Sequence, residues 1–242
     1  MKNTYAIGDI HGAAGALEQL LRRMPLQEND TLIFLGDYVD GWPQSAQVLE
    51  TLIRLKKKFD CIFLKGNHDL WCQKWLEGAP PNQTWLLHGG IATVDSYDNF
   101  ADEAKQNHLD LLKSMEYFYV DENNRLFIHA GFKSEEGPMY EGFEHNATWD
   151  RTLWELALKA EKKQQKTPSF PGRLSLFHEI YIGHTPTLGL HKMVPANACN
   201  VWNIDTGAAF YGPLSAINVG TKAIYQSDIV QLLYPGEIGR VR

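Results

Sequence analysis

The sequence of 242 residues contains only three cysteines and no long hydrophobic run. Cys61, Cys72 and Cys199 are too few and too widely spaced for a disulfide framework or a structural zinc knuckle, and we expect three inert thiols. No stretch approaches the roughly 20 apolar residues that a membrane-spanning helix needs. The first residues already follow a strand pattern and show no apolar leader. We therefore expect a cytoplasmic protein that does not act at a membrane.

The sequence also lacks an excess of positive charge. It has 23 lysines and arginines against 29 aspartates and glutamates, a net charge of −6 and an isoelectric point of about 5.8. This balance argues against nucleic acid or anionic lipid as a partner. The hydrophobic fraction of 44% and the charged fraction of 21% are typical of a globular protein. We expect residues 1–242 to form one domain; the oligomeric state stays open.

The first 80 residues alternate between short apolar runs and amphipathic helical segments. The apolar runs cover residues 5–7, 31–35 and 61–64, and a glycine ends each one. Helical periodicity follows each glycine, over residues 16–24, 48–55 and 70–76. The order strand, glycine, helix occurs three times in a row, which indicates βαβ units on a parallel sheet.

The remaining residues predict a second, more antiparallel sheet. A polar helical stretch is expected over residues 97–114, and an exposed connector over residues 161–172. Strands are expected at residues 116–120, 125–130, 178–183, 199–205 and 214–227, the last as a hairpin. We expect the two sheets to pack against each other.

Polar side chains follow all three strands of the first half. They are Asp9, His11, Asp37, Asp40, Asn67, His68 and Asp69. Taken singly, an aspartate after a strand is most often a helix cap or a turn residue. Together, at the sheet edge where α/β proteins bind ligands, so many carboxylates would be costly to bury without cations. Carboxylate, imidazole and amide oxygen match Mn, Fe, Zn or Mg, so the pattern predicts a metal site.

Two later histidines repeat this pattern of an apolar run followed by a polar residue. His129 follows the run 126–128, and His184 follows the run 180–182. His88 precedes two glycines and is expected in a turn. The other four, His108, His145, His178 and His191, are expected at the surface or in packing.

Five motifs stand in order between residues 8 and 185: GDIHG, GDYVD, GNHD, HAG and GHT. They resemble the signature of the calcineurin-like metallophosphoesterase superfamily, and specifically its bacterial phosphoprotein phosphatase family. The resemblance implies an α/β fold built as a four-layer αββα sandwich. Two mixed β-sheets would be flanked by helices, with a dimetal site at the carboxyl edges of the strands.

The resemblance also implies the residues that bind two divalent metals, with manganese favoured and iron or zinc as options. Asp9 and His11 correspond to ligands of the first metal, and Asp37 corresponds to the bridging carboxylate. Asn67, His129 and His184 correspond to ligands of the second metal.

Catalytic and substrate-binding roles follow from the same comparison of motifs. His68 corresponds to the general acid, and Asp40 corresponds to the carboxylate that orients it. Arg151 corresponds to a phosphate-binding arginine, and Asn67 also contacts the substrate. The family usually has a second phosphate-binding arginine after Asp40, where this chain has Gly41. We expect Trp42, next in the chain, to offer a flat apolar wall to an aromatic leaving group.

Three functions are compatible with these residues. The leading interpretation is a metal-dependent phosphatase that hydrolyses phosphoserine, phosphothreonine or phosphotyrosine in proteins, by direct attack of a hydroxide held between the metals. The second is a dinucleoside polyphosphate hydrolase, for which the seven tryptophans would supply stacking surfaces. The third is an inactive phosphoprotein-binding module. The partner is thus a phosphorylated protein or a small phosphate ester.

Overall fold

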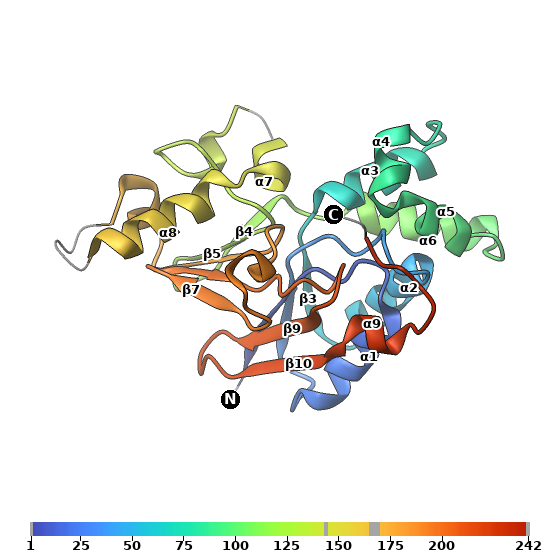
Figure 1. The fold of residues 1–242 in the computed structure, drawn as a ribbon, viewed down its shortest axis with the longest axis horizontal. Coiled ribbons are helices and arrows are strands. Elements are labelled where there is room, and N and C mark those ends of the chain that lie inside the picture. Colours follow the sequence, from blue (N-terminus) through green and yellow to red (C-terminus); the bar gives the residue numbers. More distant parts are fainter. Residues whose placement is uncertain (1, 143–144, 165–169, 241–242) are drawn as a thin grey trace.

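The computed structural model describes residues 2–142, 145–164 and 170–240. Its first sheet has the strand order β10-β9-β1-β2-β3 (Figure 1). The strands β1 (Thr4–Ile7), β2 (Thr31–Phe34) and β3 (Asp60–Phe63) are parallel. The hairpin of β9 (Pro213–Asn218) and β10 (Ile224–Ile229) joins β1 in the antiparallel sense. The three predicted strands and the predicted hairpin are confirmed.

The second sheet has the strand order β4-β5-β6-β8-β7. Its strands are β4 (Phe118–Val120), β5 (Arg125–Ile128), β6 (Glu179–Ile182), β7 (Ala196–Ala198) and β8 (Val201–Asn203). The strand predicted over residues 199–205 is present as the shorter β8, whereas β7 was not predicted. Cys199 has a φ of 53°, so the chain turns there and β8 pairs back on β7.

Helices cover the outer face of each sheet (Figure 1). The first sheet packs against α1 (Ala14–Arg23), α2 (Ser45–Lys56), α3 (Asn67–Leu76) and α6 (Asp102–Lys113), and the second against α7 (His145–Trp149) and α8 (Thr152–Gln164). The shorter helices are α4 (Gln83–Trp85), α5 (Ile91–Ser96) and α9 (Val230–Leu233). Single helical turns lie at Leu86–Gly90, Pro138–Tyr140, Gly172–Leu176 and Thr187–Leu190.

Two predictions about helix boundaries need correction, one for a helix and one for a connector. The polar segment 97–114 is helical only in α6, because α5 ends at Ser96 before a turn. The connector predicted over residues 161–172 begins inside α8, which extends to Gln164. Residues 165–169 of that connector lie outside the described residues.

The alternation of side chains along the strands explains the four layers. Successive residues of a strand point to opposite faces. Tyr5 and Ile7 pack on the helices, whereas Ala6 between them faces the other sheet. In β5, Leu126 and Ile128 likewise face helices, and Phe127 enters the core between the sheets. The predicted fold class, two mixed sheets flanked by helices, is confirmed. One domain over residues 1–242 stays a prediction.

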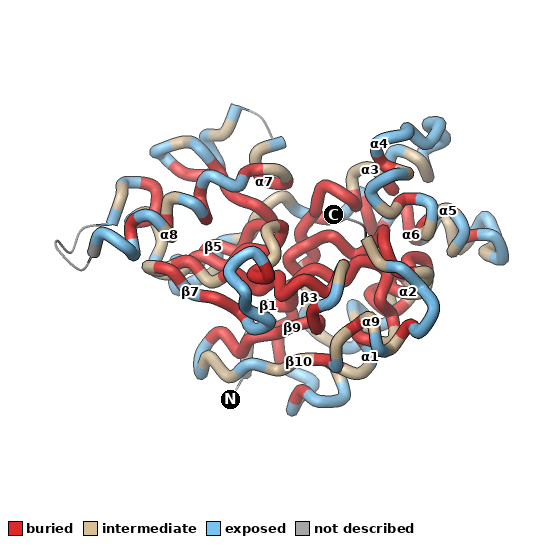
Figure 2. The backbone as a smooth tube through the Cα atoms, in the orientation of Figure 1, coloured by how far each residue is buried: buried red, intermediate tan, exposed pale blue. Residues whose placement is uncertain are grey.

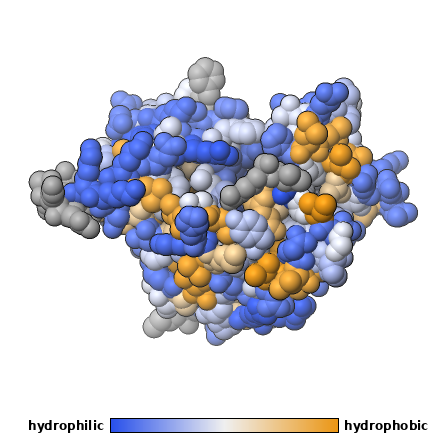
Figure 3. Space-filling view, in the orientation of Figure 1, coloured by the Kyte–Doolittle hydropathy of each residue, from blue (hydrophilic) through white to orange (hydrophobic). Residues whose placement is uncertain are grey.

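Burial follows this layering. Figure 2 shows the strands and the loops at their ends as buried backbone, with the exposed residues mostly on the outer helices and turns. Figure 3 shows a largely hydrophilic face on which apolar side chains form separate groups. Among the described residues, no helix is both long enough and apolar enough to cross a lipid bilayer.

Candidate active site

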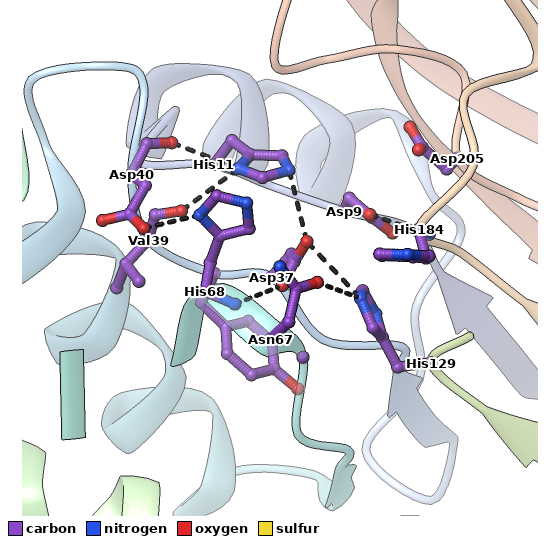
Figure 4. Close-up of polar contacts among 12 residues, drawn as sticks. Asp9, His11, Asp37, Val39, Asp40, Asn67, His68, His129, His184 and Asp205 are labelled. Atoms are coloured by element: carbon purple, nitrogen blue, oxygen red, sulfur yellow. Dashed lines mark hydrogen bonds and ion pairs between the residues drawn. The ribbon is translucent and has the colours of Figure 1, made fainter. Parts of the chain in front are cut away.

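The structure brings all the predicted metal-ligand and catalytic side chains to one place, where the strand ends of both sheets meet (Figure 4). Loops after β1 and β2 and the start of α3 supply the residues of the first three motifs. The loops after β5 and β6 supply His129 and His184. The eight residues Asp9, His11, Asp37, Asp40, Asn67, His68, His129 and His184 are all buried.

Asp37 lies at the centre of this group. Its Oδ2 atom is 3.6 Å from Nε2 of His11 and 3.4 Å from Nε2 of His129. Two clusters of side chains could each hold a metal ion: His11, Asp37 and His68 form one, and Asp37, His129 and His184 form the other. Asp37 belongs to both clusters. This is the position that a bridging carboxylate requires.

The ring orientation of His129 fits a bound cation. Its Nδ1 atom lies 2.7 Å from the carbonyl oxygen of Leu35, which assigns the proton to Nδ1. The Nε2 atom then faces Asp37 and, at 3.3 Å, Oδ1 of Asn67. Burial opposes a charge on His129, but Asp37, Asp9 and the carbonyl of Leu35 together outweigh burial and raise the pKa of His129 to about 10. Positive charge is therefore favoured at this point, and a divalent metal would supply it.

His11 and His184 are suited to metal binding in their neutral form. Nδ1 of His11 lies 3.2 Å from the carbonyl oxygens of both Val39 and Asp40, so Nε2 points toward Asp37. Burial holds the pKa of His11 well below its usual range. Burial has the same effect on the pKa of His184, with a further contribution from His129. Neutral imidazole is the form that coordinates metals.

Asp9 provides a second indication that the site is built to bind a cation. Its Oδ2 atom accepts a hydrogen bond from the backbone N–H of His184 at 3.0 Å. Its Oδ1 atom is buried without a hydrogen-bond partner among the described residues. Burial and then Asp205 raise the pKa of Asp9 well above its usual range. A metal ion coordinated by the orphaned oxygen would remove this cost.

His68 and Asp40 form a buried pair on the other side of Asp37. Nδ1 of His68 is 2.6 Å from Oδ2 of Asp40. Asp40 also accepts hydrogen bonds from Nε1 of Trp85 at 2.8 Å and from the hydroxyl of Thr93 at 2.6 Å. Burial raises the pKa of Asp40 to about 8, and burial lowers the pKa of His68 to about 3. At a pH between these two pKa values, the pair shares one titratable proton and carries no net charge.

The backbone of the site is strained. His11, Asp37, Asp40 and His184 have φ angles of 53°, 52°, 73° and 66°. Left-handed backbone in residues other than glycine costs about 1–3 kcal/mol each. Strain of this kind persists only where surrounding contacts hold it, and it concentrates at functional sites.

A cavity of about 500 Å³ opens onto these residues. Arg151, exposed between α7 and α8, donates a hydrogen bond from Nε to Nε2 of His184 at 3.4 Å. The aromatic wall includes Trp71 and Trp149, whose rings meet edge to face with centroids 5.2 Å apart. The other lining residues are Asn67, His68, His88, His184, Thr185, Pro186, Gly189, Phe210 and Arg240.

Trp42 does not contact this cavity, so the prediction that it forms a wall for the leaving group is wrong. Its side chain is fully buried, its Nε1 donates to the carbonyl oxygen of Ala208 at 2.7 Å, and its ring stacks on Tyr234. The cause is local, because the chain passes through Gly41 with a φ of 105° and directs the indole into the core.

Sequence reasoning missed several residues of the site. Asp205 lies buried close to Asp9 and follows β8 as an acid after an apolar run, which is the pattern used for the other strands. Trp85 and Thr93, which bind Asp40, come from the α4–α5 segment and carry no comparable signal. His88, predicted as a turn residue, does precede the left-handed Gly89, yet it also lines the cavity.

Comparisons with known proteins agree with this geometry. The family described as calcineurin-like phosphoesterase matches residues 2–187. A symmetrical bis(5'-nucleosyl)-tetraphosphatase of Neisseria meningitidis is 28% identical and aligns with 92% of this chain and 94% of its own length. The asymmetrical bis(5'-nucleosyl)-tetraphosphatase PrpE of Anoxybacillus flavithermus is also 28% identical, covering 87% of this chain and 88% of its own.

A solved structure supports the fold alone. A protein serine/threonine phosphatase from Saccharomyces cerevisiae superposes with a TM-score of 0.63 at 12% identity. The superposition covers 94% of this chain and 80% of the yeast chain.

Proposed function

Because the chain belongs to the calcineurin-like phosphoesterase family, and is therefore a phosphoester hydrolase, we propose that its substrates are dinucleoside polyphosphates. The observation that carries the proposal is the aromatic wall of Trp71 and Trp149 beside the candidate metal ligands. The names of the relatives from Neisseria and Anoxybacillus support it. The second interpretation made from the sequence is thus favoured over the phosphoprotein phosphatase.

We assign the metal ligands as the motifs predicted them. Two divalent ions would be held by Asp9, His11, Asp37, Asn67, His129 and His184. When bound, they would polarise the phosphoryl oxygens and lower the pKa of a water molecule. The donor set accepts manganese, iron or zinc, so it does not select among them.

The remaining polar groups bind the substrate and move a proton. Arg151 presents a planar guanidinium that can bind two phosphate oxygens, and the Asn67 amide lies at the same opening. His68 donates a proton from Nε2 to the leaving oxygen, since its Nδ1 is held by Asp40. Asp40 thereby fixes the tautomer and the ring orientation of His68.

The aromatic side chains explain how a nucleotide would be distinguished from a peptide. Trp71 and Trp149 are both half-buried at the cavity, so part of each ring is accessible. Stacking of a base on an aromatic side chain contributes about 1–3 kcal/mol. The cavity volume of about 500 Å³ also falls in the range of small-molecule sites. A phosphoserine side chain would leave this aromatic wall unused.

The test compares substrates on the manganese-loaded protein. We would measure kcat/KM for diadenosine tetraphosphate and for phosphoserine, phosphothreonine and phosphotyrosine peptides, and identify the nucleotide products by chromatography. Base stacking predicts a preference for the nucleotide of about five- to 150-fold. Faster turnover of any of the peptides would overturn the nucleotide proposal and restore the phosphoprotein interpretation. Metal binding without hydrolysis of any of them would favour the binding module.

A further inference from the structure

The segment after Asp40 has no side chain of its own to offer the substrate, because position 41 is glycine. The space beside Gly41 is filled by Arg240, which comes from a distant part of the chain. A Cβ atom at Gly41 would lie 3.0 Å from Cγ of Arg240, and one at Gly89 would lie 3.2 Å from the same atom. The aliphatic part of Arg240 therefore lies against the backbones of both glycines.

The chain holds Arg240 in this position by several contacts. Figure 1 shows the red segment that follows α9 running back to the middle of the molecule. The hydroxyl of Tyr234, at its start, accepts from the N–H of Gly15 at 2.8 Å and donates to Oε1 of Gln44 at 2.5 Å. Gly239 lies against the Trp42 ring, and the N–H of Arg240 donates to the carbonyl oxygen of Ala209 at 2.8 Å.

One donor of the Arg240 guanidinium, the Nε–H, lacks an acceptor in the described part of the chain. Nε of Arg240 is buried and has no hydrogen-bond partner among the described residues. The group lies over Phe210, with 5.6 Å from Cζ to the ring centroid, and lines the same cavity as His68 and Arg151. A buried charged donor without an acceptor is costly, and a phosphate oxygen would satisfy it.

We propose that Arg240 is a second phosphate-binding residue of the active site. Arg151 reaches the cavity from the α7–α8 segment on the second sheet, whereas Arg240 reaches it from the segment packed on Trp42, beside the first sheet. The two guanidinium groups bind the same phosphate-bearing substrate from the two halves of the molecule. The proposal rests only on the phosphoesterase part of the proposed function, because it needs a phosphate and not a nucleotide.

The experiment uses the manganese-loaded protein, p-nitrophenyl phosphate as substrate and inorganic phosphate as competitive inhibitor. Arg240→Met keeps the aliphatic packing and removes the charge, and Arg240→Lys keeps the charge without the planar fork. Glu237→Ala is the control, since its exposed side chain lies on the same segment outside the cavity lining. Manganese content and melting temperature are recorded for each variant.

Arg240→Met is expected to raise both KM and the inhibition constant of phosphate about ten- to 150-fold, as loss of a charged hydrogen bond predicts. Arg240→Lys should recover part of the loss, and Glu237→Ala should match the wild type. The manganese content should stay constant. An Arg240→Met protein with wild-type KM and phosphate inhibition would overturn the proposal. So would an equal loss in Glu237→Ala, which would assign the segment a purely structural role. Failure of diadenosine tetraphosphate as a substrate would leave this result unaffected.

Discussion

The carboxylate of Asp69 accepts a hydrogen bond from the backbone N–H of Asp37 at 2.8 Å. It also accepts from the N–H of Tyr38 at 2.9 Å and from the N–H of Gly66 at 2.8 Å. Asp69 is the last residue of the GNHD motif, and Asp37 belongs to GDYVD. One motif thus holds the left-handed backbone of the other, and this fixes the carboxylate shared by the two candidate metal-binding clusters.

Asp69→Asn is expected to destabilise the protein and to weaken manganese binding. The amide offers one acceptor oxygen, so at least one buried N–H would face an NH₂ group. The free energy of unfolding should fall by at least about 1.5–3 kcal/mol, the cost of one charged hydrogen bond. Urea unfolding with and without Mn²⁺ measures both effects. Asp110→Asn on the surface of α6 is the control and should change stability by less than about 0.5 kcal/mol. Wild-type stability in Asp69→Asn would refute the claim that Asp69 holds the backbone of Asp37.

His68→Asn is expected to lower kcat in a way that depends on the leaving group. A general acid contributes about 10²–10⁴-fold when the leaving oxygen needs a proton. An alkoxide leaving group, such as the one that leaves from phosphoserine or glycerol phosphate, needs that proton far more than a nucleotide that leaves as a phosphate does. The loss should therefore be larger for glycerol phosphate than for diadenosine tetraphosphate, at unchanged manganese content. An equal loss on both substrates would argue against proton donation by His68.

Trp149→Leu is expected to raise KM for diadenosine tetraphosphate without changing inhibition by inorganic phosphate. The centroid of its ring lies 5.2 Å from that of Trp71 and 6.1 Å from that of His184, so the ring adjoins both the proposed base site and the candidate metal ligands. Losing one stacked base predicts about a five- to 150-fold increase in KM. Trp202→Leu, on β8 and outside the cavity lining, should leave KM unchanged. Equal effects of the two variants would contradict a role in base recognition.

His108 predicts a pH dependence of stability that is separate from the active site. The ring is buried, with Nδ1 2.9 Å from the hydroxyl of Tyr97 and Nε2 3.0 Å from Oε1 of Glu50. Burial lowers the pKa of His108, although the hydrogen bond that His108 makes to the Glu50 carboxylate opposes the shift. Below pH 6.5, the unfolded chain therefore takes up a proton before the folded chain does, and stability falls as the pH drops.

The measurement is the difference in unfolding free energy between pH 7.5 and pH 5.5. His108→Gln keeps the possibility of hydrogen bonds but cannot titrate, so this variant should lose less stability over that interval than the wild type. The same pH difference in both proteins would show that His108 does not contribute.

Much of the site could be predicted because each polar motif begins where a predicted strand ends. Residues 5–7, 31–34 and 126–128 alternate between two buried faces, and the polar residue after each strand can only emerge at the edge of the sheet. Parallel pairing of β1 with β2 and of β5 with β6 then brings these edges together. The positions of Asp37, His129 and His184 follow from that topology once the two sheets pack face to face.

The residues that could not be predicted come from segments without such a pattern. Thr93 and Trp85 reach Asp40 only because the α4–α5 segment folds over the loop after β2. Trp42 follows a motif in sequence, yet a left-handed glycine turns it into the core. Arg240 lies about 200 residues from Gly41, and only tertiary packing brings its side chain there.

The most direct test of the account is the number of Mn²⁺ ions that the chain binds, measured by calorimetric titration alongside hydrolysis of p-nitrophenyl phosphate. We predict two ions per chain and activity that rises as both bind. In Asp37→Asn, which alters the one side chain common to both clusters, we predict fewer than two ions and loss of hydrolysis. A wild-type chain that binds one ion or none, or an Asp37→Asn chain that still binds two and hydrolyses the substrate, would contradict the account.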